Sequence, residues 1–145
     1  MMNEVHLFDY ITLEKTPCFG CCPVYKIKVY SPGLVEWEGI DFVARKGKGS
    51  WYIAPEEAKR ATEIAEKIIA LLEEHERLIK AGEKELQFVT DCSSCEVTIK
   101  YRDGQYKCAN HYHGDMSTPK ELGRLENKID RVVGTEKWVG KGNHT

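Results

Sequence analysis

The chain has 145 residues, of which 41% are hydrophobic and 30% are charged, and its formal net charge is −2. These values describe one globular domain that needs neither a metal nor a disulfide to fold, and they exclude a disordered chain. The absence of a basic excess argues against general nucleic-acid binding. No apolar run approaches the roughly 20 residues that cross a bilayer, and the first residues lack the pattern of a signal peptide. We therefore expect a cytoplasmic protein with no membrane partner.

The composition of the charged residues is biased, with 17 Glu against 6 Asp and 15 Lys against 6 Arg, and there are only two Gln. Enrichment in Lys and Glu with few thermolabile amides is typical of hyperthermophilic proteins. Hyperthermophiles are also the exception to the rule that cytosolic thiols stay reduced. The composition therefore fits a thermostable protein from a thermophile, in which disulfides can form in the cytosol.

Hydrophobic and polar residues alternate through the N-terminal third of the chain, which predicts strands because successive side chains on a strand point to opposite faces. Four strands are expected, around residues 5–13, 25–29, 35–37 and 49–53. The Ser-Pro-Gly sequence at residues 31–33 supplies a turn between the second and the third strand.

A long helix is predicted next, because alanine, isoleucine and leucine recur at three- and four-residue steps between Ala61 and Leu72. Pro55 suits its first turn, and it should end between His75 and Gly82. A second helix is predicted over residues 118–133, with a capping box at Thr118-Pro119-Lys120-Glu121 and a stop at Gly134.

Between the helices, alternation around Val97 to Tyr101 predicts a hairpin, and Asp103-Gly104 is a strong signal for a two-residue turn. This turn sets a register in which Ile99 lies opposite Cys108, Glu96 opposite His111, and Cys95 opposite Tyr112.

The predicted fold is therefore α+β, with the order ββββαββα. Two helices with one apolar stripe each are best buried against a single face of a mainly antiparallel sheet. We expect one domain over residues 1–139, a disordered tail over residues 140–145, and a Trp138 side chain that folds back onto the core.

The stretch from Thr16 to Tyr25 contains a threonine-proline-cysteine-phenylalanine-glycine run followed by Cys22-Pro23-Val24. It resembles the hallmark of a bacterial family of domains of unknown function, the family numbered 6438. The resemblance extends over about residues 9 to 140 and implies an α+β domain without an established activity. It also implies that Cys18 and Cys22 act together. Further similar positions are Gly39, Phe42, Trp51, Pro55, Asp91, Trp138 and Val139.

The chain departs from this pattern at Cys21, at Ala54, and at Cys92 and Cys95. The last two form a C-x-x-C pair, as do Cys18 and Cys21. Two such pairs can hold zinc or an iron–sulfur cluster through four thiolates. The loops that carry them are far apart in sequence, so this alternative requires that they meet in the fold.

The other interpretation is that the cysteines form disulfides. Cys18 and Cys22 flank a glycine-containing turn in which the Cα separation of a bridge is attainable, and Cys92 and Cys95 could close a second short loop. We predict a Cys18–Cys22 bond with Cys21 pointing away from it. Cys108 is expected to be a buried packing thiol.

His111 and His113 lie two residues apart on a predicted strand, a spacing at which both can ligate one metal ion. The simpler interpretation is that they are surface residues, with His111 beside Glu96. No Ser-His-acid arrangement, catalytic carboxylate pair or dinucleotide fingerprint is visible in the sequence, which favours a protein that is not an enzyme.

Two functional interpretations remain. The first is a non-enzymatic binding or structural module without a cofactor, whose loops are held by disulfides at Cys18, Cys22, Cys92 and Cys95. The alternative is a metal-binding or thiol-redox protein in which Cys18, Cys21, Cys92 and Cys95 hold zinc or an iron–sulfur cluster. The sequence specifies neither a ligand nor a partner.

Overall fold

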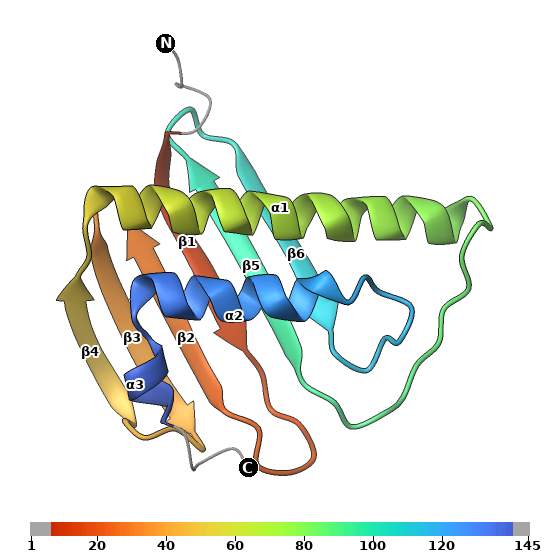
Figure 1. The fold of residues 1–145 in the computed structure, drawn as a ribbon, viewed down its shortest axis with the longest axis horizontal. Coiled ribbons are helices and arrows are strands. Elements are labelled where there is room, and N and C mark those ends of the chain that lie inside the picture. Colours follow the sequence, from red (N-terminus) through yellow and green to blue (C-terminus); the bar gives the residue numbers. More distant parts are fainter. Residues whose placement is uncertain (1–6, 141–145) are drawn as a thin grey trace.

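Six strands form one antiparallel sheet in the computed structural model, which describes residues 7–140. Their spatial order is β4-β3-β2-β1-β5-β6, so β1 and β2 are central (Figure 1). Consecutive strands are neighbours throughout, except that β5 returns after a helix to pair with β1. The strands are β1 (Phe8–Lys15), β2 (Val24–Tyr30), β3 (Leu34–Asp41), β4 (Gly47–Tyr52), β5 (Ser94–Tyr101) and β6 (Tyr106–Tyr112).

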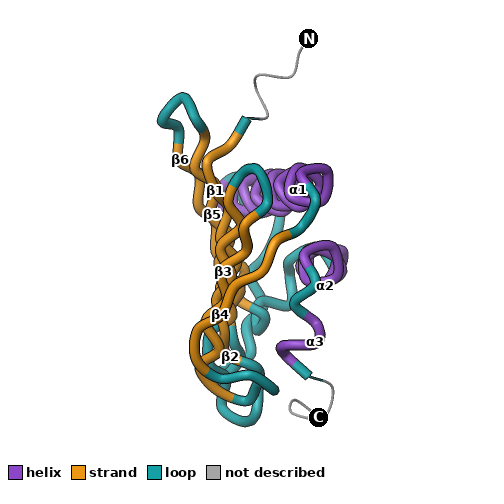
Figure 2. The backbone as a smooth tube through the Cα atoms, turned by 90° about the vertical axis from the view of Figure 1, so that its left-hand side faces the viewer, coloured by secondary structure: helices purple, strands orange, loops and turns teal. Residues whose placement is uncertain are grey.

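Three helices cover one face of this sheet and leave the other face open (Figure 2). They are α1 (Pro55–Lys80), α2 (Glu121–Val133) and the short α3 (Glu136–Val139). The predicted α+β fold and its order are confirmed, with α3 as an addition. Within residues 7–140 no helix is long and apolar enough to cross a membrane. The expected tail lies, apart from Gly140, outside the described residues.

Local sequence explains the start of α1 and the end of α2. α1 begins at Pro55, and Glu56 and Glu57 lie in its first turn, where the helix dipole favours negative charge. α2 ends at Gly134, which has a φ of 82° in the left-handed region that favours glycine. The predicted capping box is wrong, because α2 begins at Glu121 and the Thr118 hydroxyl donates instead to the carbonyl of Asp115 at 2.9 Å.

The β5–β6 hairpin has a register one residue away from the predicted one. Cys95 pairs with His111 and Thr98 with Cys108, because the loop contains three residues and ends on Gly104 with a φ of 95°. A slip of one residue moves every side chain of a strand to the other face. Cys108 is consequently exposed rather than buried, and His111 is buried rather than exposed. Both expectations about these side chains were wrong for this single reason.

The core lies between the sheet and the helices, and aromatic rings dominate it at the β3–β4 edge. Trp37, 2% exposed, stacks on Tyr25 with ring centroids 5.0 Å apart. Trp138 of α3 folds back onto this core, as expected, and contacts both Trp37 and Trp51 at centroid distances of 5.7 and 4.7 Å. We call Trp37, Trp51 and Trp138 the tryptophan cluster.

Candidate ligand-binding site

One of the two expected disulfides is present. Cys18 and Cys22 are bonded, with their Cα atoms 5.7 Å apart, and Cys21 is exposed beside the bridge. Cys92 and Cys95 are free, which corrects the prediction of a second bridge. The physical reason is that Cys95 is already part of β5 and points into the core, whereas Cys92 lies in the preceding loop with Sγ 3.7 Å from the Thr90 carbonyl.

The alternative four-thiolate centre is not assembled in this structure. Cys18 is used by the disulfide, and Cys95 is fully buried. Burial, reinforced by the charge of Glu126, raises the pKa of the Cys95 thiol well above its usual value. A thiol in that state is a poor nucleophile and a poor metal ligand at neutral pH. Among residues 7–140 the only group of three or more metal-ligating side chains lies elsewhere, at His111, His113 and Glu126.

Four side chains from four neighbouring strands form one row on the helix-facing side of the sheet. The register pairs Lys15 with Tyr25 on one side and with Cys95 on the other, and it pairs Cys95 with His111. The row therefore runs Tyr25, Lys15, Cys95, His111 across β2, β1, β5 and β6, at the end of the sheet that carries the disulfide loop. We call these four residues the polar row.

Two acidic residues of α2 face the polar row. Glu126 and Asp130 are four residues apart and thus lie on one face of the helix, and their exposed fractions are 1% and 7%. Both carboxylates are removed from water, so each needs hydrogen-bond donors from the protein. The sheet supplies them, with histidines at one end of the row and Tyr25 at the other.

Glu126 lies between two histidine rings. Its Oε2 is 2.5 Å from His111 Nδ1, and its Oε1 is 2.9 Å from His113 Nε2. The second nitrogen of each ring has a partner as well, Thr118 Oγ1 for His111 at 3.2 Å and Ser93 Oγ for His113 at 2.9 Å. Burial acts to raise the pKa of Glu126, but the hydrogen bonds from the two histidines outweigh it, so this pKa lies below its ordinary value.

Asp130 has a different environment one turn later. The Tyr25 hydroxyl and the Thr135 hydroxyl each donate to one of its oxygens at 2.5 Å. Burial raises the pKa of Asp130 above its ordinary value, although Lys15 and both hydrogen bonds act in the opposite direction. The pKa of Tyr25 is also raised, chiefly by burial and then by Asp130. Tyr25 is therefore a neutral hydrogen-bond donor at physiological pH.

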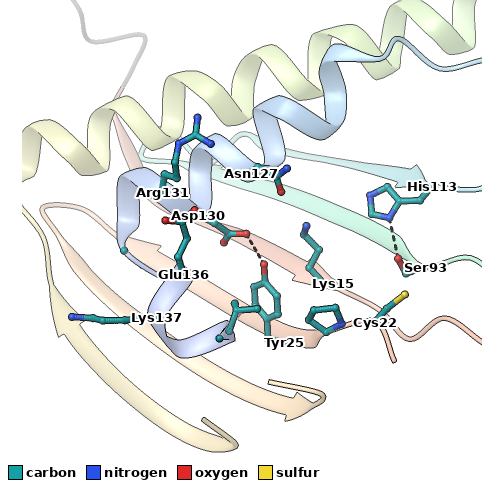
Figure 3. Close-up of a pocket in the computed structure, with 14 residues that line it drawn as sticks. Lys15, Cys22, Tyr25, Ser93, His113, Asn127, Asp130, Arg131, Glu136 and Lys137 are labelled. Atoms are coloured by element: carbon teal, nitrogen blue, oxygen red, sulfur yellow. Dashed lines mark hydrogen bonds between the residues drawn. The ribbon is translucent and has the colours of Figure 1, made fainter. Parts of the chain in front are cut away.

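A cavity of about 1070 Å³ opens between α2, α3 and this end of the sheet. Its inner wall includes Lys15, Cys22, Tyr25, Ser93 and His113 (Figure 3). The exposed side chains that line it further out are Asn127, Arg131, Glu136 and Lys137. The disulfide contributes directly to this wall, because Cys22 and the adjacent Pro23 both line the cavity.

Lys15 is the central positive charge of this cavity. Figure 3 shows its side chain between Tyr25 and His113, directed toward α2. Among the described residues, its ammonium makes no hydrogen bond and no direct ion pair. Its charge nevertheless acts to lower the pKa of both Glu126 and Asp130. A half-buried ammonium whose hydrogen atoms are unused can donate to a bound molecule.

The sequence interpretation missed Lys15, Glu126 and Asp130, although a signal was present. Lys15 continues the alternation of Ile11 and Leu13 on the buried face of β1. In the same way Glu126 falls in the buried stripe of α2 with Leu122, Ile129 and Val133. A charge at a position where the periodicity demands an apolar residue indicates a buried polar site.

The comparisons with known proteins add the family but no activity. No curated protein matches the chain in sequence. The model of one family matches residues 9–133, and its description is that of a domain of unknown function, DUF6438. That match covers all six strands, α1 and α2 apart from the first residue of β1. The chain therefore belongs to the family of domains of unknown function numbered 6438.

Proposed function

We propose that this chain is a non-enzymatic binding module that takes a small organic anion into the cavity beneath α2. The observation that carries the proposal is the Lys15 ammonium, which lies in the cavity wall without a directly bonded acidic partner among the described residues. A carboxylate or phosphate group placed on Lys15 would gain a charge-assisted hydrogen bond, which is stronger than one between neutral groups.

The surroundings of Lys15 support an anion rather than a cation. Ser93 and His113 add polar groups on the inner wall, and at the mouth the positive charges of Arg131 and Lys137 outnumber the negative charge of Glu136. Asp130, which also lines the cavity, already accepts hydrogen bonds from Tyr25 and Thr135. Burial also raises the pKa of this carboxyl above its ordinary value.

The size of the cavity supports an organic ligand. Sites for small molecules typically enclose about 300–1,000 Å³ and are mostly preformed, and the cavity of about 1070 Å³ is slightly larger than that range. The Cys18–Cys22 bond fits the same role, since it fixes a loop that contributes Cys22 and Pro23 to the wall. In this proposal the bridge preorganises the site, and preorganisation strengthens binding by reducing the entropy lost on association.

The experiment compares matched anionic and neutral probes by isothermal titration calorimetry. Benzoate and benzamide have similar shapes and differ in charge, and Lys15→Met removes the ammonium while keeping most of the side-chain volume. Lys26→Met is the matched control, because Lys26 is exposed on the opposite face of β2. We expect benzoate to bind the wild type and Lys26→Met alike, and to bind Lys15→Met at least about tenfold more weakly. Equal affinities for benzoate and benzamide, or no effect of Lys15→Met, would contradict the proposal.

A further inference from the structure

We propose that His111, His113 and Glu126 form a binding site for one divalent transition-metal ion of the zinc type, at the inner corner of the cavity. Each residue offers one ligand atom, and the three atoms lie within 4.8 Å of one another. This set contains none of the cysteines that the sequence suggested as ligands. It is also independent of the anion proposed above, since the three ligands come from the protein alone.

The geometry of the three side chains fits one ion. The two rings project from the same side of the β6 end, with centroids 4.7 Å apart and planes at 87°, while Glu126 approaches from α2. Zinc binds histidine nitrogen and carboxylate oxygen at about 2.0–2.2 Å, so two of its ligands lie roughly 3.4 Å apart. The present nitrogen–oxygen distances are 2.5 and 2.9 Å. An ion therefore requires the three groups to separate by about 1 Å or less, which side-chain rotation can supply.

The hydrogen bonds around the rings match those of ligating histidines. A metal-bound histidine almost always donates its other ring N–H to an oxygen that fixes the tautomer. The only hydrogen of the Thr118 hydroxyl is donated to the Asp115 carbonyl, so Thr118 Oγ1 accepts a hydrogen bond from His111 Nε2. Ser93 Oγ lies 2.9 Å from His113 Nδ1, a position from which it can accept the corresponding hydrogen bond when the ring carries its hydrogen on Nδ1. Both outer partners of a metal site are thus in place.

The inner nitrogen of His111 is placed to coordinate an ion that lies between it and Glu126. With the ring hydrogen on Nε2, the Nδ1 lone pair points at a carboxylate oxygen 2.5 Å away. An ion in that position turns the repulsion between these two atoms into coordination by both. Two imidazoles and one carboxylate converging on it form a ligand set used by zinc, with a further coordination position left for a ligand. One of the three ligands, His113, also lines the cavity, so the proposed site adjoins it.

A second buried histidine in the described chain also contacts a carboxylate, but its surroundings do not form a metal site. His75, 7% exposed, also meets a carboxylate, with Nε2 3.1 Å from Asp115 Oδ2. Its Nδ1, however, lies 3.2 Å from the Lys84 ammonium, and no second histidine joins the pair. His75 is therefore the matched control for the variants of the proposed site.

The test is zinc binding to the full chain after chelator treatment, measured by competition with a chromophoric zinc indicator. Exposed thiols also bind zinc, so the measurement is repeated after Cys21, Cys92 and Cys108 are replaced by serine. We expect one equivalent of zinc to bind in both backgrounds. His113→Gln and Glu126→Gln should each weaken binding at least about 100-fold, because the loss of an outer partner alone typically costs 10–100-fold. His75→Gln should change the affinity less than about threefold.

Two further variants distinguish the loss of a metal ligand from misfolding of the chain. Thr118→Val and Ser93→Ala keep all three ligands and remove one outer hydrogen bond each, so each should weaken zinc binding about 10–100-fold. Lys15→Met should tighten zinc binding while it weakens benzoate binding, because the Lys15 charge repels a cation and attracts an anion. The absence of stoichiometric zinc binding, its loss in the background without Cys21, Cys92 and Cys108, or equal affinities of the wild type and of the ligand and outer-bond variants would overturn the proposal. A weak benzoate response with intact zinc binding would instead contradict only the proposed anion site.

Discussion

The two ends of the helix-facing side of the sheet are built in opposite ways. At the β3–β4 edge the tryptophan cluster packs aromatic rings against each other, and the two indole N–H groups of Trp37 and Trp51 donate to backbone carbonyls. Under the middle of α2 the polar row holds charged and hydrogen-bonding groups, with buried acids above it. Tyr25 belongs to both regions, since its ring stacks on Trp37 and its hydroxyl bonds to Asp130. The first region stabilises the fold through aromatic packing. In the second region the fold holds polar groups away from water, where they hydrogen-bond to one another.

The largest effect is expected at the centre of the tryptophan cluster. Trp37→Ala removes a side chain that is only 2% exposed and leaves a cavity next to Tyr25. The free energy of unfolding, measured in urea, should fall by about 3 to 5 kcal/mol. A loss below about 1 kcal/mol would show that this end of the core is not tightly packed.

Trp138→Ala should have a smaller effect, because Trp138 is only partly buried and Arg45 covers its ring at 4.2 Å. We expect a loss of about 2 to 3 kcal/mol, below the value for a fully buried aromatic. Gly49→Ala provides a cross-check, since a Cβ at Gly49 would lie 2.4 Å from the Trp138 ring. Gly49→Ala should therefore destabilise the wild type by about 1 to 3 kcal/mol and have little effect in Trp138→Ala.

The disulfide is expected to contribute less than the aromatic core. The Cys18–Cys22 bond closes a loop of sequence separation 4, so its entropic contribution is at most about 2 kcal/mol. The double variant Cys18→Ser, Cys22→Ser should lower the free energy of unfolding by that amount or less. Under the binding proposal this double variant should reduce benzoate affinity by a larger factor than Cys21→Ser does. An equal response of the two variants would show that the disulfide has no role in benzoate binding.

The last stability effect concerns Asp130 and depends on pH. Because burial raises the folded-state pKa of Asp130, its contribution to stability is full below the unfolded pKa of about 3.9 and is lost as the pH rises through the folded value. The wild type should lose stability relative to Asp130→Asn as the pH increases from 4, by at most about 1.4 kcal/mol per pH unit. Denaturation in urea from pH 4 to pH 7 measures this difference. A constant difference over that range would show that the pKa of Asp130 is not raised.

Much of the fold could be predicted from the sequence because its signals are local. The alternation in β1 to β3, the stripe of α1, and the stop at Gly134 each reflect a few neighbouring residues. The Asp103-Gly104 signal was also local, but it suits both a two-residue turn and a three-residue loop ending on glycine. The structure has the longer loop, with the Gln105 N–H donating to the Asp103 side chain at 2.9 Å.

That choice decided how much of the candidate site could be predicted. With the shorter turn, His111 lies beside Glu96 on the open face of the sheet. With the longer loop it lies beside Cys95 and reaches Glu126. The polar row depends on three strand registers at once. A motif search along the chain does not reveal such long-range pairings, whereas the charges of Lys15 and Glu126 at apolar positions do indicate that a buried polar site exists.

The pairing of the cysteines illustrates the same limit. The Cys18–Cys22 bond lies within one loop, and the family resemblance together with the short spacing predicted it. The fate of Cys95 depends on where β5 begins, and this placed its thiol in the core instead of in a loop with Cys92. Whether the protein is thermostable and whether it resides in the cytosol remain predictions from composition alone.

The measurement that tests the central claim most directly is a titration of the ¹⁵N-labelled protein with benzoate, followed by two-dimensional NMR. The cavity beside the polar row and the tryptophan cluster carry separate reporters. The backbone amides of Lys15, Ser93 and Asn127 report on the first, and the indole N–H groups of Trp37 and Trp51 report on the second. The account predicts saturable shifts at the first set, absent in Lys15→Met, with little change at the indoles. Shifts centred on the indole signals, or no saturable shifts at the first set, would contradict the assignment of binding to the polar row.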